Sequence, residues 1–250
     1  MQTWEAVVVV AAGVWAGVIN TVVGSGTLVT FPILVALGYP PVTATTSNAI
    51  GLISGSITGA IGYRHDLEGQ GTRVIQYAIV SAVGALGGAA LLLLLPADAF
   101  ELLVPALVGL AVVLVAVQPA LAKRLARRPG ADQRSSFVIL PLIGLIGMYG
   151  GYFTASQGIV FVGAMGLVMS DPLRRLNAFK NALMAVVNVV AGIVYALVAP
   201  VSWPIVGLLA IGSVAGGLLG VRVGRRLSPA VLRIAIVIIG TAAIVVLLAR

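Results

Sequence analysis

Apolar residues fill ten segments of this chain, and short polar or glycine-containing breaks separate them. The segments cover about residues 6–23, 28–38, 43–63, 73–95, 98–117, 137–153, 158–169, 174–199, 203–221 and 229–249. A helix needs about 20 residues to cross the hydrocarbon of a bilayer. The third, fourth, fifth, eighth, ninth and tenth segments reach that length, whereas the second and seventh are too short. The pattern predicts an all-α integral membrane protein with eight to ten helical segments.

The two short segments follow polar breaks that contain glycine. The first break is Gly24–Gly26, and the second runs from Thr154 to Gly158. Each pair of segments is either a re-entrant hairpin of two partial helices or two strongly tilted spans. Both interpretations return the chain to the side of the membrane from which it came.

The two halves of the chain share short patterns in the same order, which predicts two inverted repeats. The matching patterns are Ser47–Ala49 with Lys180–Ala182, Gly59 with Gly192, and Gly87–Gly88 with Gly216–Gly217. We expect a first repeat over residues 1–117, a basic linker over 118–136 and a second repeat over 137–250. Each repeat has a broken pair followed by three full spans. Inverted repeats with interrupted helices are typical of secondary transporters, with the substrate near the midplane.

Positive charge predicts the orientation. Every Lys and Arg except Arg250 falls in one of four loops, at 64–73, 118–136, 170–180 and 222–233. The segment count places these loops on one side, and Lys and Arg are enriched in cytoplasmic loops. We therefore predict a multi-pass protein of the cytoplasmic (inner) membrane, with both termini on the extracytoplasmic side.

Composition supports a lipid-facing surface. Hydrophobic residues make up 60% of the chain and charged residues 9%, whereas soluble proteins carry about 25% charged residues. The net charge of +8 does not indicate nucleic-acid binding, because the basic residues lie in loops without interleaved aromatic residues. The absence of Cys excludes disulfides, thiolate catalysis and Cys metal sites. A cleavable signal peptide is not expected, because Met1–Glu5 lacks a positive charge.

The two breaks are the first candidate site. A broken helix leaves backbone N–H groups that must face protein or water, and free N–H groups at a helix N-terminus favour anions. Glycine lets a ligand approach the backbone, and hydroxyl and amide side chains add donors. The competing interpretation is that the glycines are packing contacts and the hydroxyls bond to their own helix. The candidate residues are Asn20, Gly24, Ser25, Gly26, Thr27, Tyr152, Ser156, Gln157 and Gly158.

The second candidate group lies at the start of the third and eighth segments. It comprises Thr46, Ser47, Asn48, Lys180 and Asn181. Asn48 and Asn181 occupy matching positions, and we expect them to face each other, either to bind substrate or only to join helices. Lys180 either extends to the membrane surface or points inward to hold an anion.

The acidic residues limit the mechanism. All seven lie in loops or at segment ends, so no carboxylate at mid-membrane is available as a proton relay. Coupling to H⁺ would use the substrate or a loop group, Na⁺ could bind backbone carbonyls, and uniport is the simplest mechanism. We expect no cofactor and no metal. An enzyme is disfavoured, because apart from a Ser–Lys pair involving Lys180 no catalytic constellation remains. An anion channel and a non-transporting assembly factor remain alternatives, and a homodimer stays open.

Several motifs together resemble one known family. They are Gly17–Pro32 with its break, Thr45–Asn48, Gly147–Phe153 followed by Ser156–Gly158, Lys180–Asn181, Trp203–Pro204, and Gly212–Gly220 leading to Arg225–Arg226. In this order, over nearly the whole chain, they are similar to the sulfite exporter TauE/SafE family, also called the 4-toluene sulfonate uptake permeases.

The resemblance implies a carrier of sulfite, sulfoacetate or another sulfonate, with some relatives linked to carboxylates. Two departures fall on the candidate site. The family often has three glycines in the first break, where this chain has Ser25 and Thr27 around Gly26. The family's Gly-Thr-Ser/Asn-Lys pattern is Asn177–Lys180 here. We therefore predict a small-anion transporter that works by alternating access, and leave the anion open.

Overall fold

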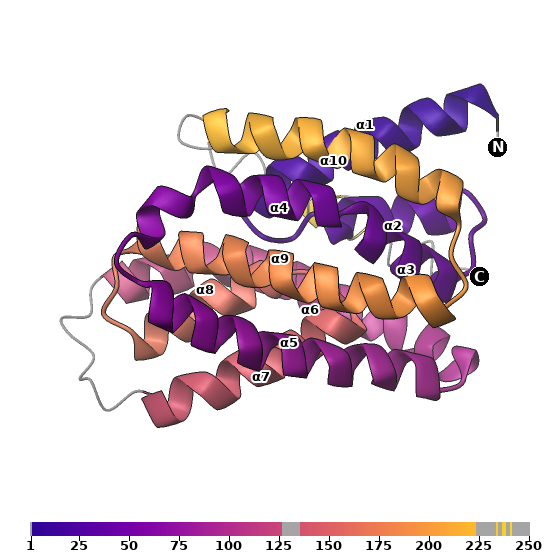
Figure 1. Ribbon diagram of the computed structural model, residues 1–250. Helices are drawn as coiled ribbons and strands as arrows, with labels where there is room; N and C mark the ends of the chain where they lie inside the picture. The colour runs from indigo at the N-terminus through magenta and orange to yellow at the C-terminus, as the bar shows by residue number, and fades with distance from the viewer. Residues whose placement is uncertain (1, 127–135, 224–233, 235–236, 239–240, 242–250) are drawn as a thin grey trace.

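Helices account for every regular element in the part of the chain that the structure describes. The structure is a computed structural model, and it describes residues 2–126 and 136–223, together with residues 234, 237, 238 and 241. Figure 1 shows the arrangement. The elements are α1 (Thr3–Val22), α2 (Thr27–Ala36), α3 (Pro41–Gly51), α4 (Ile53–Gly62), the 3₁₀ helix η1 (Arg64–Leu67), α5 (Gly71–Leu94), α6 (Ala97–Ala126), α7 (Ser136–Tyr152), α8 (Gln157–Val168), α9 (Leu173–Val198) and α10 (Trp203–Val223).

Five of these helices are long and apolar enough to cross a membrane. They are α1, α5, residues Asp98–Val117 of α6, α9 and α10. The long helices run side by side through the molecule (Figure 1). The prediction of an all-α, multi-pass membrane protein is therefore confirmed. The tenth predicted segment, 229–249, lies outside the described residues except for isolated positions.

The helices α2 and α8 are short, as the apolar pattern predicts. They have 10 and 12 residues. At a rise of 1.5 Å per residue, α8 extends only about 18 Å, whereas the hydrocarbon is about 30 Å thick. Helices of this length fit the interpretation of partial helices, and a tilt would shorten their reach across the bilayer further.

One predicted helix is divided. The third segment, 43–63, is wrong as a single helix because α3 ends at Gly51 and α4 begins at Ile53, with Leu52 (φ −87°, ψ −2°) between them. The Ser213 hydroxyl of α10 donates to the Gly51 carbonyl at this point (3.1 Å). Gly51 and Gly55 also lie directly against α10. Close packing against α10 at two glycines explains the kink, and sequence periodicity does not reveal it.

The helix α6 is longer than its apolar segment. It continues to Ala126, so the beginning of the linker expected at 118–136 is helical, and residues 127–135 lie outside the described part. Ala, Leu, Lys and Arg, which dominate residues 120–126, are strong helix formers. The helix therefore continues after the apolar pattern ends.

Helices from the first half of the chain pack mainly against helices from the second half. The most extensive helix contacts are those of α1 with α10 and of α5 with α7, and both α3 and α4 pack on α9. A two-fold relation between the halves would exchange α1–α10 with α7–α5. The inverted repeat remains a prediction, and this pattern is compatible with it.

Glycines from the predicted repeat lie at both of these contacts. Gly88 of α5 touches the α7 backbone at Met148 and Tyr152, and Gly216 of α10 touches the α1 backbone at Val14 and Gly17. Small residues let membrane helices approach closely, so that many weak contacts form between them. These glycines hold the long helices against α1 and α7, the two helices that lead into the breaks.

Gly88→Ala should destabilise the protein by about 1–3 kcal/mol, because its methyl group would overlap the Met148 carbonyl and push α5 from α7. The control is Gly87→Ala, because nothing lies within 4 Å of a methyl group at this neighbouring position. Thermal unfolding of both variants in detergent measures the difference. Equal losses of stability in the two variants would show that close α5–α7 packing is not the cause.

Candidate functional site

The two helix breaks cross and touch each other. The Gly158 N–H at the start of α8 donates to the carbonyl oxygen of Gly24 (3.0 Å). A Cβ on Gly24 would lie 2.5 Å from the Gly158 Cα. On the other side of the crossing, the hydroxyls of Thr27 and Thr154 lie 2.9 Å apart. The structure thus brings together the two breaks that the sequence singles out, far apart along the chain.

The first break is closed by a side chain from the helix before it. The Asn20 side-chain oxygen accepts from the Gly26 N–H (2.6 Å), which satisfies one donor at the start of α2. Gly24 has φ +90°, a conformation that glycine adopts without steric cost. Gly26 lies against the Ala16 backbone. Asn20, Gly24 and Gly26 therefore shape the break.

The second break is held by two hydroxyls, one from the break itself and one from α7. Ser156 adopts φ 59°, which is uncommon for a residue with a side chain, and its hydroxyl donates to the Ala111 carbonyl of α6 (3.1 Å). The Tyr149 hydroxyl donates to the Ala155 carbonyl (2.6 Å). The Phe153 ring packs edge-on against Phe31 of α2, with centroids 5.4 Å apart. These contacts fix the turn in the chain before α8.

Lys180 points inward and is fully buried. Its ammonium group donates to the carbonyl oxygens of Asn20 (3.0 Å) and Thr21 (2.9 Å) at the end of α1. The alternative in which Lys180 reaches the membrane surface is therefore wrong. The partners are backbone carbonyls rather than a serine hydroxyl, so these contacts form no Ser–Lys pair. The positive charge meets the negative end of the α1 dipole.

Asn48 and Asn181 contact different helices. Asn48 accepts from the Thr30 hydroxyl, and its amide donates to the Thr27 hydroxyl (3.2 Å), both on α2. Asn181 donates to the Thr21 carbonyl (3.3 Å) beside Lys180. The first asparagine thus lies at the α2 side of the crossing and the second at the end of α1. Their hydrogen bonds do not join them to each other.

Three buried polar side chains of the predicted site have no hydrogen-bond partner among the described residues. They are Ser25, the amide of Gln157 and the hydroxyl of Tyr152. Gln157 packs directly on Gly150, and the Tyr152 ring packs on Phe100 (5.7 Å between centroids). A buried polar group without a partner is costly, so these atoms are available to a ligand.

Two predicted site residues lie elsewhere. The Thr46 hydroxyl donates to the Pro200 carbonyl (2.6 Å), and the Ser47 hydroxyl accepts from the Ser202 N–H (2.9 Å). Pro200 and Ser202 form the turn between α9 and α10. The structure therefore assigns Thr46 and Ser47 to this turn and not to the crossing of the breaks.

Sequence reasoning missed other polar residues near the crossing or on α9. They are Thr30, Thr154, Asn188 and Tyr195. Thr30 follows Thr27 by one helical turn. The Tyr195 hydroxyl donates to the Gly151 carbonyl at the end of α7, and Asn188 donates to Ser56 of α4 (2.7 Å). For the two residues on α9, helical spacing could have revealed them, because residues 180, 184, 188 and 195 share one side of that helix.

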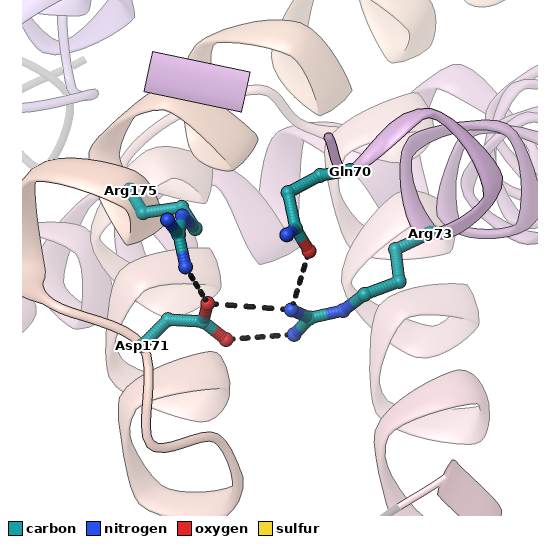
Figure 2. Close-up of polar contacts among 4 residues, drawn as sticks. All are labelled: Gln70, Arg73, Asp171 and Arg175. Carbon is teal, nitrogen blue, oxygen red and sulfur yellow. Dashed lines mark hydrogen bonds and ion pairs between the residues drawn. The ribbon is translucent and has the colours of Figure 1, made fainter. Parts of the chain in front are cut away.

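At the end of the molecule where α4 ends and α9 begins, ion pairs join residues 66–73, which include the start of α5, to residues 171–175, which include the start of α9. Arg73 contacts both carboxylate oxygens of Asp171 (2.7 and 3.3 Å), and Arg175 donates to the same carboxylate (3.1 Å). Gln70 accepts from Arg73 (2.7 Å), and Figure 2 shows the four side chains meeting. Burial would raise the pKa of Asp171, but hydrogen bonds from the two arginines outweigh it and hold the pKa below 3.8.

Comparison with known proteins identifies the family of this chain. The sequence model of the family described as sulfite exporter TauE/SafE matches residues 9–247. This protein belongs to the TauE/SafE family. One relative is the "probable membrane transporter protein ORF9" of Sinorhizobium sp., 26% identical over 94% of this chain and 88% of its own length. Another is the "probable membrane transporter protein YfcA" of Escherichia coli K12, 26% identical over 85% of this chain and 76% of its own length. Both names describe transporters rather than enzymes.

In this TauE/SafE protein, Gly24→Ala should destabilise more than Gly38→Ala. Both glycines have φ +90°, but only a methyl group on Gly24 would meet another helix, at Gly158. Backbone strain of about 1–2 kcal/mol is common to both variants. The excess loss in Gly24→Ala, measured by thermal unfolding, reports the contact between the breaks. Equal losses would mean that the crossing contributes nothing.

Acidification should leave the Asp171 ion pairs intact over the ordinary range. Because the pKa is lowered in the folded protein, the stabilisation is present above the unfolded pKa and is lost only as pH falls through the folded pKa. The stability difference between the wild type and Asp171→Asn should therefore stay constant from pH 7 to about pH 5. A difference that disappears by about pH 5.5 would contradict the lowered pKa.

Proposed function

We propose that this protein is a secondary transporter that carries a small organic or sulfur-containing anion across the cytoplasmic membrane. Sulfite, sulfoacetate and other sulfonates are the substrates to test first. Membership of the TauE/SafE family supports a transporter role. The substrate site lies where the breaks cross, between the starts of α2 and α8.

The observation that carries the proposal is the burial of Lys180 at this crossing. Among the described residues it is the only charged side chain that is fully buried, and its ammonium group contacts carbonyl oxygens rather than a carboxylate. A buried charge without a counter-ion is expensive. Of the three ammonium donors, two are used. An anion supplies both the missing charge and a partner for the third donor.

The helix ends provide the rest of the site. The N-termini of α2 and α8 both lie at the crossing, and each carries a partial positive charge. The N–H groups of Gly26 and Gly158 already bond to protein oxygens, so the dipoles act together with side-chain donors. Ser25 and Gln157 have buried polar atoms free for this role. Asn48 and Asn181 position Thr27 and the end of α1.

Transport would proceed by alternating access, with one half of the molecule moving against the other. The crossed packing of α1 with α10 and of α5 with α7 supports an inverted repeat of the kind used for this purpose. The loops of residues 64–73 and 170–175 meet through ion pairs, which supports their location on one side. By the charge rule that side is cytoplasmic, and the N-terminus lies outside. Uniport is the simplest coupling.

Binding is tested by thermal shift of the detergent-solubilised protein with sulfite, sulfoacetate, methanesulfonate and sulfate, with dimethyl sulfone as a neutral control. Saturable stabilisation by anions alone is expected, because a ligand that binds the folded state raises its stability. Counterflow of the bound anion into proteoliposomes then separates a carrier from a channel or an assembly factor. Stabilisation without counterflow would refute transport by a carrier.

Lys180→Gln should weaken anion binding about tenfold or more, because a charge-assisted hydrogen bond of about 1.5–3 kcal/mol is lost. The glutamine amide can still donate to the α1 carbonyls, which separates charge from helix capping. Arg64→Gln is the matched control, because Arg64 is an exposed basic residue that also donates to a carbonyl, that of Ile61. Unchanged affinity in Lys180→Gln, measured by titration, would place the anion elsewhere.

A further inference from the structure

At the basic end of the molecule, ion pairs hold two positively charged segments together despite their mutual repulsion. The segments 64–73 and 170–180, here called the two basic loops although α5 and α9 begin within them, carry positive residues. Like charges at close range repel each other. The structure nevertheless joins the two loops through two aspartates. Asp171 bonds to Arg73, and Asp66 bonds to Arg174 (2.6 Å). Both carboxylates are largely buried, with side chains 9% and 11% exposed. Because the Arg174 side chain is exposed, its ion pair with Asp66 contributes little, and the contact between the loops depends mainly on Asp171.

The arginines that hold Asp171 form a prepared oxyanion site. Arg73 approaches both carboxylate oxygens (Figure 2), the paired geometry that guanidinium groups offer to carboxylates and other oxyanions. The Arg73 guanidinium also lies over the rings of Phe179 (5.2 Å) and Tyr77 (5.8 Å), which fixes its position. Removal of Asp171 would thus leave its partner in place.

Arg175 also lines a pocket at the surface. An open pocket of about 290 Å³ is lined by Arg174, Arg175 and the loop residues His65, Asp66 and Glu68. Arg175 reaches both this pocket and Asp171, and its Nε is buried without a hydrogen-bond partner among the described residues. Because Arg175 lines the pocket and is partly exposed, an incoming anion can contact it before the Asp171 carboxylate is displaced.

We propose that Arg73, Asp171 and Arg175 form a gate that a small oxyanion operates by taking the place of the Asp171 carboxylate. Without an anion, Asp171 occupies the two arginines and ties the loops together. When an oxyanion binds Arg73 and Arg175, Asp171 loses its partners and the loops separate. The exchange keeps the arginines neutralised at each stage, and no bond is made or broken covalently.

The helix α9 links the gate to the proposed central site. Arg175 and Lys180 are both on α9, and Phe179, which Arg73 covers, precedes Lys180 directly. The ligand class, a small oxyanion, rests on the proposed function, because the same substrate would meet the gate first and Lys180 second. The gate itself rests on the ion pairs alone.

The test measures the distance between spin labels at Glu68→Cys and Leu173→Cys, two exposed positions on either side of the gate. The chain has no other cysteine, so only these two positions react. Methanesulfonate is the probe and dimethyl sulfone its neutral control. In the labelled double-cysteine protein with its gate residues unchanged, methanesulfonate should shift the main distance to a longer value, and dimethyl sulfone should not. Asp171→Asn should show the longer distance without any anion.

Two further variants keep the result interpretable if Asp171→Asn folds poorly. The charge swap Arg73→Asp/Asp171→Arg should restore the short distance and abolish its response to methanesulfonate. Asp98→Asn removes an acid from another helix, at the start of α6, and should behave as the wild type. A short distance in Asp171→Asn would overturn the gate. A long distance there without any effect of methanesulfonate on the wild type would overturn its operation by anions.

The experiments can refute the gate and the central site independently of each other. In Lys180→Gln, methanesulfonate should still lengthen the distance across the gate at a concentration where thermal stabilisation through the central site is strongly reduced. If Lys180→Gln abolishes both responses, the distance change follows central binding and the gate proposal is overturned. If the gate responds while no anion affects transport in any variant, the proposed function fails and the gate stands.

Discussion

Two interrupted helices in a membrane protein impose the constraint on which the rest of this structure depends. Hydrocarbon offers no hydrogen bonds, so each helix end at depth must find its partners within the protein. Here the partners are side chains of other helices. Lys180 and Asn181 cover the carbonyls at the end of α1, and Asn20 covers an N–H at the start of α2. Satisfying these ends concentrates polar groups where the breaks cross.

The same constraint explains why glycine is common where helices meet. The breaks can satisfy each other only if α1 and α7 are held accurately, and close contacts with α10 and α5 hold them. Gly216 and Gly88 permit these contacts because they have no Cβ. At the crossing itself, Gly24 and Gly158 let two backbones touch. The close helix packing and the hydrogen bonds at the helix ends thus depend on each other. A change in either would move the residues of the candidate site.

The helix α9 connects the two charged regions of the molecule. Its first turn carries the arginines that bind Asp66 and Asp171, and its second turn carries Lys180. Farther along, Asn188 and Tyr195 bond to α4 and to the end of α7. A displacement of α9 would therefore change the contacts at the basic end, at the end of α1 and at the second break. This makes α9 the element through which the proposed gate and the proposed site would communicate.

The sequence alone was sufficient for the class of protein, for the approximate positions of most described helices and for the two breaks. Apolar length and charge in loops are local properties, and the bilayer acts on them directly. The family resemblance was also visible in short motifs, and the family match confirms it. The kink at Leu52 was not visible, because contacts with α10 cause it. Thr46 and Ser47 were placed in the site from a repeat pattern, but they bond to the α9–α10 turn.

The partners of the polar residues were decided only by tertiary structure. Lys180 could equally have reached the surface or pointed inward, because both directions are open to a lysine near a helix end. Its inward course depends on the end of α1 lying within reach, a contact across 160 residues of chain. Likewise, the sequence placed Arg73 and Asp171 in loops, and only the folded chain pairs them. A helix can be predicted from its own residues, whereas a hydrogen bond between distant helices depends on where both of them lie.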